Sequence, residues 1–312
     1  SPFNRALHLA DGTVTVADAN GTVFTRSWCA FESYATLISQ GARFLHDLAV
    51  AEVPGRWQTQ LLSDGPVAKD GKARSLGLAF KAVREKDFPA SLLMAVVSAF
   101  RLEDAQASRQ EDMDAILTAV GDERNIFDAT MRARFGGAVL KELHKDPEAL
   151  GEWIDDLRNS RLRKLSGDFP RDDEKRRSPL VAEATDAVLT VLPHTDIQEL
   201  RIGYGTVVDD HDVVLGGIVA SGKLVSLDLA RSMVPDAVAV AIGKALQSAL
   251  CRLQTLNLTG NRVGAEGGLS LLEGLGKNTT LTMLNLSSNP VSSISNIKEQ
   301  FTSDFKDRVS FA

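Results

Sequence analysis

Leu224-x-x-Leu227-x-Leu229-x-x-Ser232-x-Val234, Leu253-x-x-Leu256-x-Leu258-x-x-Asn261-x-Val263 and Leu281-x-x-Leu284-x-Leu286-x-x-Asn289-x-Val291 are three copies of one pattern. They align without gaps, and a weaker copy precedes them at Ile197, Leu200, Ile202, Gly205 and Val207. In each copy apolar and polar residues alternate, which predicts a strand with one buried face. Apolar residues at helical spacing follow each strand. A single unit cannot bury its own apolar face, so the copies must stack.

The pattern resembles the leucine-rich repeat family, and its period resembles the ribonuclease-inhibitor subtype, which alternates a strand with an α-helix. The resemblance implies that Asn261 and Asn289 hydrogen-bond backbone groups of neighbouring turns. It also implies a protein-binding surface at exposed strand positions, because repeat proteins bind their partners there. The residues that we expect to contact a protein partner are Thr255, Asn257, Thr282 and Asn285.

The first part of the chain predicts a strand at residues 13–18, a helix that begins near Thr25 or Ser27, and a second strand within residues 44–53. Strand, helix and strand in this order predict an α/β unit with parallel strands. The stretch Arg26-x-Trp28-Cys29-x-x-Glu32 resembles the Toll/interleukin-1 receptor (TIR) family, in which Ser stands where this chain has Arg26. The resemblance covers residues 1–55 and implies a partial TIR-like or Rossmann-like segment. A TIR-like segment combined with leucine-rich repeats also resembles predicted proteins of dinoflagellates and other protists.

The TIR resemblance implies a possible enzyme. Glu32 matches the catalytic carboxylate of NAD-cleaving TIR domains, where NAD is the substrate and the carboxylate stabilises developing positive charge. A TIR fold begins with further strands and a pocket-forming loop, which this chain does not show before its motif. The alternative is structural: Trp28 packs against the sheet, Cys29 is buried, and Glu32 caps its helix or pairs with Arg26.

The middle of the chain reads as helical, because apolar residues recur at helical spacing from Phe88 to about residue 165. We therefore expect three segments: a partial α/β segment at 1–87, a helical region at 88–178, and leucine-rich repeats with a C-terminal cap at 179–312. The residues expected to form that cap are Phe301, Phe305, Val309 and Phe311.

Composition narrows the classes of function. The net charge is −6, which argues against general nucleic-acid binding. The histidines are scattered and stand at no metal-ligand spacing with Cys29 or Cys251, so we expect no metal and no cofactor. The two cysteines suit a reducing compartment.

The sequence predicts no transmembrane segment, because its longest strongly apolar run, residues 91–100, is too short to span a bilayer. We expect an intracellular, soluble protein. The chain opens on Ser1-Pro2 without an initiator Met, as in a processed or partial product, and this leaves the organelle open. The sequence therefore favours a non-enzymatic scaffold for protein–protein interaction, in one form an accessory subunit of a larger complex. A TIR-like NAD hydrolase that uses Glu32, with the repeats as its sensor, is the alternative.

Overall fold

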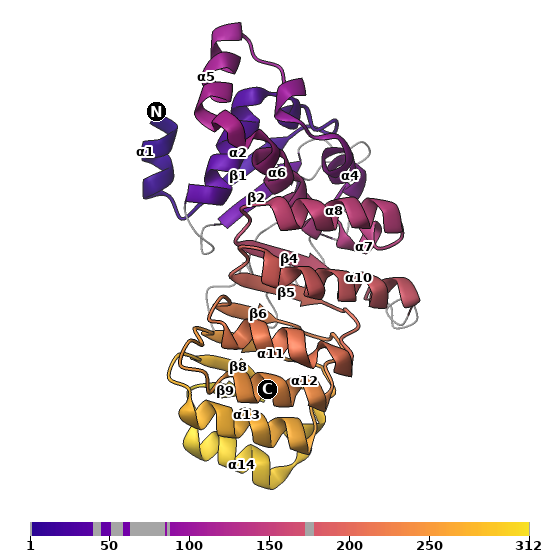
Figure 1. The fold of residues 1–312 in the computed structure, drawn as a ribbon, viewed down its shortest axis with the longest axis vertical. Coiled ribbons are helices and arrows are strands. Elements are labelled where there is room, and N and C mark those ends of the chain that lie inside the picture. Colours follow the sequence, from indigo (N-terminus) through magenta and orange to yellow (C-terminus); the bar gives the residue numbers. More distant parts are fainter. Residues whose placement is uncertain are drawn as a thin grey trace. The chain divides into compact units, whose positions relative to one another are not determined.

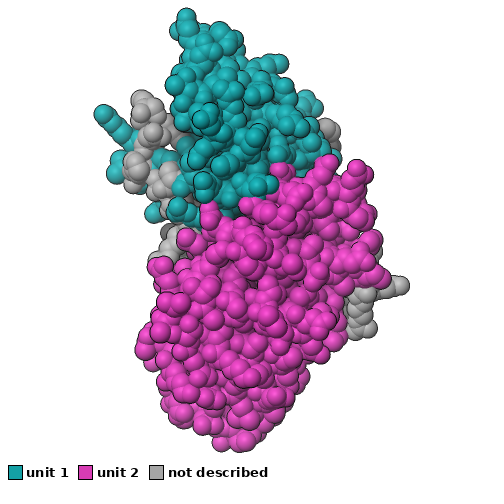
Figure 2. All heavy atoms as spheres, in the orientation of Figure 1, with its two compact units in different colours: residues 1–139, 159–163 teal, residues 140–158, 164–312 magenta. Residues whose placement is uncertain are grey.

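The computed structural model forms two compact units. The described residues are 2–39, 45–50, 59–62, 85, 88–171 and 178–311. The first unit holds residues 1–139 and 159–163, and the second holds residues 140–158 and 164–312 (Figure 2). The three segments expected from the sequence were drawn from its pattern, whereas the two units are defined by contacts. The three-segment division therefore stays a prediction.

The first unit combines a small sheet with helices (Figure 1). Its helices are α1 (Pro2–Leu9), α2 (Ser27–Ser39), α4 (Ala90–Ala99), α5 (Gln110–Val120) and α6 (Arg124–Ala138), with 3-10 turns η1 (Thr22–Thr25), η3 (Leu102–Asp104) and η4 (Gly121–Glu123). Its strands are β1 (Gly12–Ala17), β2 (Leu45–Val50) and β3 (Gln60–Leu62), in the order β1-β2-β3. Strands β1 and β2 are parallel, which confirms the expected strand–helix–strand unit, and β3 pairs antiparallel to β2.

Aromatic rings join the helices of the first unit. The Tyr34 ring of α2 stacks on Phe127 of α6 with 4.2 Å between centroids. Phe24 meets Phe135 edge-on at 4.9 Å. These rings are buried, and burying one large apolar side chain contributes about 1.5–3 kcal/mol. The strand–helix unit is therefore held on α6 by side chains that lie about 100 residues away in the chain, as their numbers show.

The second unit is a stack of strand–helix repeats. Its helices are α7 (Leu140–Leu143), α8 (Pro147–Asn159), α10 (Pro179–Val191), α11 (Asp212–Ala220), α12 (Asp236–Ala245), α13 (Ala265–Lys277) and α14 (Ser295–Asp304), with 3-10 turns η5 (Leu192–His194), η6 (Asp209–His211) and η7 (Pro290–Ser293). Its strands are β4 (Lys164–Asp168), β5 (Glu199–Gly203), β6 (Ser226–Asp228), β7 (Thr255–Asn257), β8 (Met283–Asn285) and β9 (Val309–Ser310). All six pair in parallel and in chain order, with one of α10–α14 between each pair of strands (Figure 1).

One face of this sheet is the core of the unit. Each of the strands β4–β8 carries a leucine that is at most 1% exposed, and the register places these leucines side by side. The row comprises Leu165, Leu200, Leu227, Leu256 and Leu284. Helices α11, α12 and α13 pack against one another and contribute buried side chains such as Leu215, Ile242 and Leu271. The helices therefore cover the leucine face, and the other face of the strands stays open.

Asn261 confirms the expected role of the pattern's asparagine. Its side-chain NH₂ donates to the carbonyl oxygens of Leu229 and Leu258 at 2.9 and 2.8 Å. Its Oδ1 accepts the backbone N–H groups of Ser232 and Val234 at 2.9 and 3.0 Å. The side chain is 7% exposed, so it satisfies backbone groups that would otherwise be buried without a partner.

The structure differs from the expectation at residues 164–168, which the sequence placed in the helical region 88–178. They form β4, which pairs with β5 and extends the repeat sheet by one strand. Leu162 and Leu165 occupy the leucine positions of the pattern, but Gly167 stands where the third leucine would be. Because of that glycine, residues 162–167 do not match the repeat pattern.

The C-terminal segment closes the other end of the sheet. Helix α14 packs on α13, and β9 pairs with β8. Phe301 is fully buried, and Phe311 meets its ring edge-on at 5.6 Å. The Arg308 side chain donates to the carbonyl oxygens of Leu281 and Asn278 at 2.7 and 2.8 Å. The segment therefore packs on the last repeat.

Candidate functional site

The open face of β5–β8 carries two rows of half-buried side chains. The strand register aligns them across neighbouring repeats. The first row is Glu199, Ser226, Thr255 and Met283, and the second is Arg201, Asp228, Asn257 and Asn285. Because successive strand residues point to opposite sides, both rows lie opposite the buried leucines. The face presents hydroxyl, amide and charged groups at the spacing of adjacent strands, about 4.8 Å.

The second row ends each strand with a side chain that bonds its own backbone. The Oδ1 atoms of Asp228, Asn257 and Asn285 accept the N–H groups found two residues later, at 3.0, 3.1 and 3.0 Å. This Asx-turn geometry directs the chain out of the strand. The carbonyl oxygens of Asn257 and Asn285 are thereby held, while their NH₂ groups donate to no side chain or backbone group within the described residues. Those NH₂ groups are available to an external acceptor.

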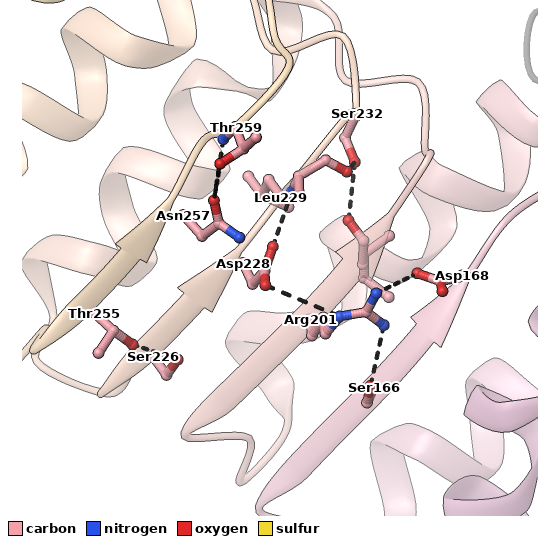
Figure 3. Close-up of polar contacts among 12 residues, drawn as sticks. Ser166, Asp168, Arg201, Ser226, Asp228, Leu229, Ser232, Thr255, Asn257 and Thr259 are labelled. Atoms are coloured by element: carbon pink, nitrogen blue, oxygen red, sulfur yellow. Dashed lines mark hydrogen bonds and ion pairs between the residues drawn. The ribbon is translucent and has the colours of Figure 1, made fainter. Parts of the chain in front are cut away.

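A charged cluster occupies the β4–β6 end of the face (Figure 3). Asp168 Oδ1 lies 2.8 Å from Arg201 Nη2, and its Oδ2 lies 3.2 Å from Arg171 Nη2. Arg201 Nε lies 3.9 Å from Asp228 Oδ2, and Arg201 Nη1 lies 3.5 Å from Ser166 Oγ. One arginine side chain thus connects groups on three neighbouring strands.

The Leucine Rich repeat family profile matches residues 250–272 and 277–293 of this chain. These residues are leucine-rich repeats. Each match contains one repeat strand, β7 or β8, and the structure adds the strand–helix alternation of the ribonuclease-inhibitor type. Repeats of this family suggest protein–protein interaction. The match does not reach residues 1–55, which carry the TIR resemblance. No curated protein matches the chain.

The structure places three of the four expected contact residues on the open face of the repeats. Thr255, Asn257 and Asn285 lie in the two rows, and Thr255 Oγ1 donates to Ser226 Oγ at 2.6 Å (Figure 3). Thr282 lies one residue before β8, outside the rows, and its hydroxyl donates to the Gln254 carbonyl oxygen at 3.0 Å. Met283 takes the place in the first row. Contact of the four expected residues with a protein partner stays a prediction.

Sequence reasoning missed the charged residues of the same face. Arg201 and Asp228 occupy the pattern position between the two strand leucines that Asn257 and Asn285 occupy in later repeats. Aligning that one position across the repeats was enough to find them. Asp168 and Arg171 had no such signal, because β4 does not show the full pattern.

Glu32, the candidate of the alternative function, lies on α2 and is half-buried. Burial raises the pKa of its carboxyl. Among the described residues, no ion pair joins it to Arg26. Trp28 is 40% exposed and contacts Phe31 edge-on, and its expected packing against the sheet stays a prediction. Cys29 is half-buried rather than buried.

Neither a metal-binding cluster nor a membrane-spanning helix is present among the described residues. Within the described ranges, no group of three or more His, Cys, Asp or Glu residues is placed to hold a metal ion. The ring of His211 is used in a hydrogen bond within the chain, because its Nδ1 accepts the Val208 N–H at 3.0 Å. Among the described residues, no helix is long and apolar enough to cross a lipid bilayer.

Proposed function

We infer that the chain is a non-enzymatic scaffold that binds a protein partner through the open strand face of its repeats. The observation that carries this is the pair of aligned rows on β5–β8. Their side chains are half-exposed and lie on parallel strands that pair in register. An accessory subunit of a larger assembly is one form of this role.

Pre-ordering favours this face over the helical face. Side chains on the rows are already fixed by hydrogen bonds such as Thr255 to Ser226 and Asn257 to Thr259, so binding restricts few further rotamers. Ordering a flexible side chain at an interface costs about 0.5–1.5 kcal/mol, which this arrangement reduces. The amide donors of Asn257 and Asn285 then supply orientation-dependent bonds.

Position-specific photo-crosslinking tests the proposal. A benzoylphenylalanine placed at Met283, in the first row, is compared with one at Leu269, which is 50% exposed on α13 of the same region. The proposal predicts that Met283 links one defined protein in an extract of the native source, that Leu269 does not, and that added unlabelled chain competes. The same proteins linked from both positions, or linking from Leu269 alone, would contradict it.

An NAD hydrolase is the second candidate, and one observation favours it. Helix α2 of the parallel β1–α2–β2 unit carries a carboxyl, Glu32, whose pKa is raised by burial. Functional carboxyls are commonly perturbed in this way. Glu32 does not line the apolar cavity of about 180 Å³ formed by residues such as Phe24, Leu92 and Val96.

The enzyme proposal has a direct assay. If it holds, the purified chain cleaves NAD, and Glu32→Ala abolishes cleavage while the melting temperature stays within a few degrees. Cleavage that survives in the variant, or its absence in the parent chain under the same conditions, rejects this candidate and leaves the scaffold proposal untouched.

A further inference from the structure

The outer face of helices α11 and α12 carries few charged groups. The two helices lie side by side on the leucine face of the repeat sheet (Figure 1). Asp212 is the only charged residue among the nine of α11, whereas α13 carries Glu266, Glu273 and Lys277. A helix with one side in water has a polar stripe on that side, and a helix that is apolar all round is normally covered. The sequence of α11 is therefore that of a helix with a covered outer face.

A groove of about 470 Å³ runs between these two helices. Six of its ten lining residues are glycine or alanine, so no long side chain fills it there. A Cβ at Gly217 would meet no atom within 4 Å, which shows that space is open above this position. At Gly216, by contrast, a Cβ would lie 3.2 Å from that of Ala241, so this glycine lets the helices approach. The groove is thus an apolar recess with room for a side chain from outside.

A projecting apolar side chain stands at the edge of the same groove. Val213 of α11 lines the groove and is 79% exposed. Val240 of α12 also lines it, is half-exposed, and takes the equivalent place in the next repeat. Apolar side chains gathered on an exposed face mark interaction surfaces. One face therefore offers both an apolar projection and an apolar recess.

Opposite charges mark two ends of the groove. Asp212 lies at the start of α11 and Lys244 near the end of α12, and both line the groove. The Asp212 carboxylate accepts the Val213 N–H at 2.6 Å, and among the described residues neither charge belongs to an ion pair. When the two repeats are aligned, Lys244 lies level with Gly217, about one and a half helical turns beyond Asp212.

We propose that this α11–α12 face binds the same face of a second copy of the chain. A two-fold axis that lies in the face, at right angles to the line from Asp212 to Lys244, places Asp212 of each copy over Lys244 of the other. The same rotation carries Val213, the neighbour of Asp212, over the groove of the other copy. Such an interface is isologous, because the same residues serve on both sides. Apolar contact supplies the affinity, and the two charge pairs fix the orientation.

A second copy fits this face because each copy supplies what the other lacks. The face holds a projection and a recess, and one negative and one positive charge, so it is complementary to itself. It spans only two short helices, less than an interface of standard size, so we expect a weak dimer with a dissociation constant on the order of 10 µM. The inference is independent of the proposed function, because the strand face takes no part in it.

Sedimentation velocity on the full chain measures the association. The chain has a mass of 33.6 kDa, and we expect a reversible shift toward twice this mass between about 1 and about 200 µM protein. A single species of 33.6 kDa over the whole range overturns the proposal.

Gly217→Gln separates association from folding. The new side chain enters open space and replaces a helical glycine, so the variant should melt at or above the temperature of the parent chain. It fills the groove, so the dissociation constant should rise at least about tenfold, as it should in Val213→Glu. Leu250→Glu is the matched control, because Leu250 is 68% exposed and lies outside the groove, and we expect a change below about twofold. Undiminished association in either groove variant, or an equal loss in the control, overturns the proposal.

Exchange of the two charges tests the symmetry. Asp212→Lys and Lys244→Glu each bring like charges together twice in the dimer and should weaken it at least about fivefold, whereas the combined variant should return to within about twofold of the parent chain. Thermal melts of the three variants report any loss of folding separately. A combined variant that is as weak as the single ones contradicts the two-fold arrangement and overturns the proposal.

Photo-crosslinking identifies the occupant of the face. With benzoylphenylalanine at Val213, we expect the chain to link to a second copy of itself in an extract of the native source. A different protein linked there, without the self-linked product, shows that another partner covers the face and overturns the proposal.

Discussion

Asn261 and Asn289 join neighbouring repeats through buried side-chain bonds. Asn289 repeats the arrangement of Asn261 one unit later, with its NH₂ on the Leu258 carbonyl oxygen at 2.7 Å and its Oδ1 on the Val263 N–H at 3.0 Å. In the preceding unit Ser232 does part of the same work, because its hydroxyl donates to the Ile202 carbonyl oxygen at 2.9 Å. The resemblance to leucine-rich repeats implied this role for both asparagines, whose side chains both donate and accept.

Replacement of Asn261 should show the size of this contribution. Asn261→Ala leaves the Ser232 and Val234 N–H groups without their acceptor, and each orphaned buried group costs about 1–3 kcal/mol. We expect a loss of about 3 kcal/mol or more in the free energy of unfolding, measured by urea denaturation. Asn261→Ser should lose less, because a hydroxyl serves at Ser232. A change in the Ala variant below about 1 kcal/mol would contradict this role.

Left-handed turns follow the repeat strands β5–β8 at Tyr204, Arg231, Gly260 and Ser288. The sequence did not predict the left-handed turns, because glycine is the residue that signals a positive φ angle and only one of these turns has it, at Gly260. Arg231 gives a direct test of strain. Arg231→Ala keeps the unfavourable conformation, whereas Arg231→Gly removes it, so the glycine variant should be more stable than the alanine variant by about 1 kcal/mol. Thermal melts of the two variants measure the difference. A more stable alanine variant would show that the turn carries no such cost.

Strands and helices of the repeats follow the apolar period, and the strands β5–β8 lie where the pattern predicted them. The sequence did not predict the two outer strands, β4 and β9. Strand β4 lacks one leucine of the pattern, and β9 is only two residues long, so both depend on pairing with a strand already formed. Tertiary pairing rather than local pattern makes them strands.

Helices α12 and α13 pack so closely that their glycines become structural. A Cβ at Gly274 would lie well inside contact distance of the Gly243 carbonyl oxygen, whereas a Cβ at Gly276 would meet only Phe305, at 3.9 Å. In the interior of a helix, alanine is more stable than glycine by about 0.5–1 kcal/mol. We therefore expect Gly276→Ala to be neutral or stabilising and Gly274→Ala to destabilise by about 1–3 kcal/mol, as overpacking does. Equal effects of the two changes in denaturation would contradict the close packing.

At the scale of the molecule, stability should depend on the charge state of His144. The side chain is buried beside the Phe169 ring, and burial lowers its pKa, with a smaller opposing effect from the bond to the Leu140 carbonyl oxygen. Below the ordinary histidine pKa the unfolded chain therefore binds a proton that the folded chain resists. Stability falls as pH drops through about 6.5.

The variant His144→Gln cannot titrate, so its free energy of unfolding should fall less than that of the parent chain between about pH 7.5 and about pH 5.5. Urea denaturation at both pH values measures this difference. Parallel pH profiles for the two chains would show that His144 is not the group responsible.

Only part of the candidate face could be predicted from the sequence. Thr255, Asn257 and Asn285 were predictable because the repeat fixes which side of a strand each residue occupies. Arg171 was not, because it belongs to a segment after β4, and only the folded sheet brings it to Tyr204. Local pattern therefore predicts the face, and the pairing of β4 adds Arg171 to it.

The most direct measurement is the affinity of the cross-linked partner, purified, for two matched variants by isothermal titration calorimetry. Met283→Arg places a bulky cation in the first row of the open face, and Leu269→Arg places the same group on α13. The account predicts that Met283→Arg weakens binding at least about tenfold and that Leu269→Arg leaves it within about twofold. Unchanged affinity in Met283→Arg, or a larger loss in Leu269→Arg, would show that the partner does not bind the strand face.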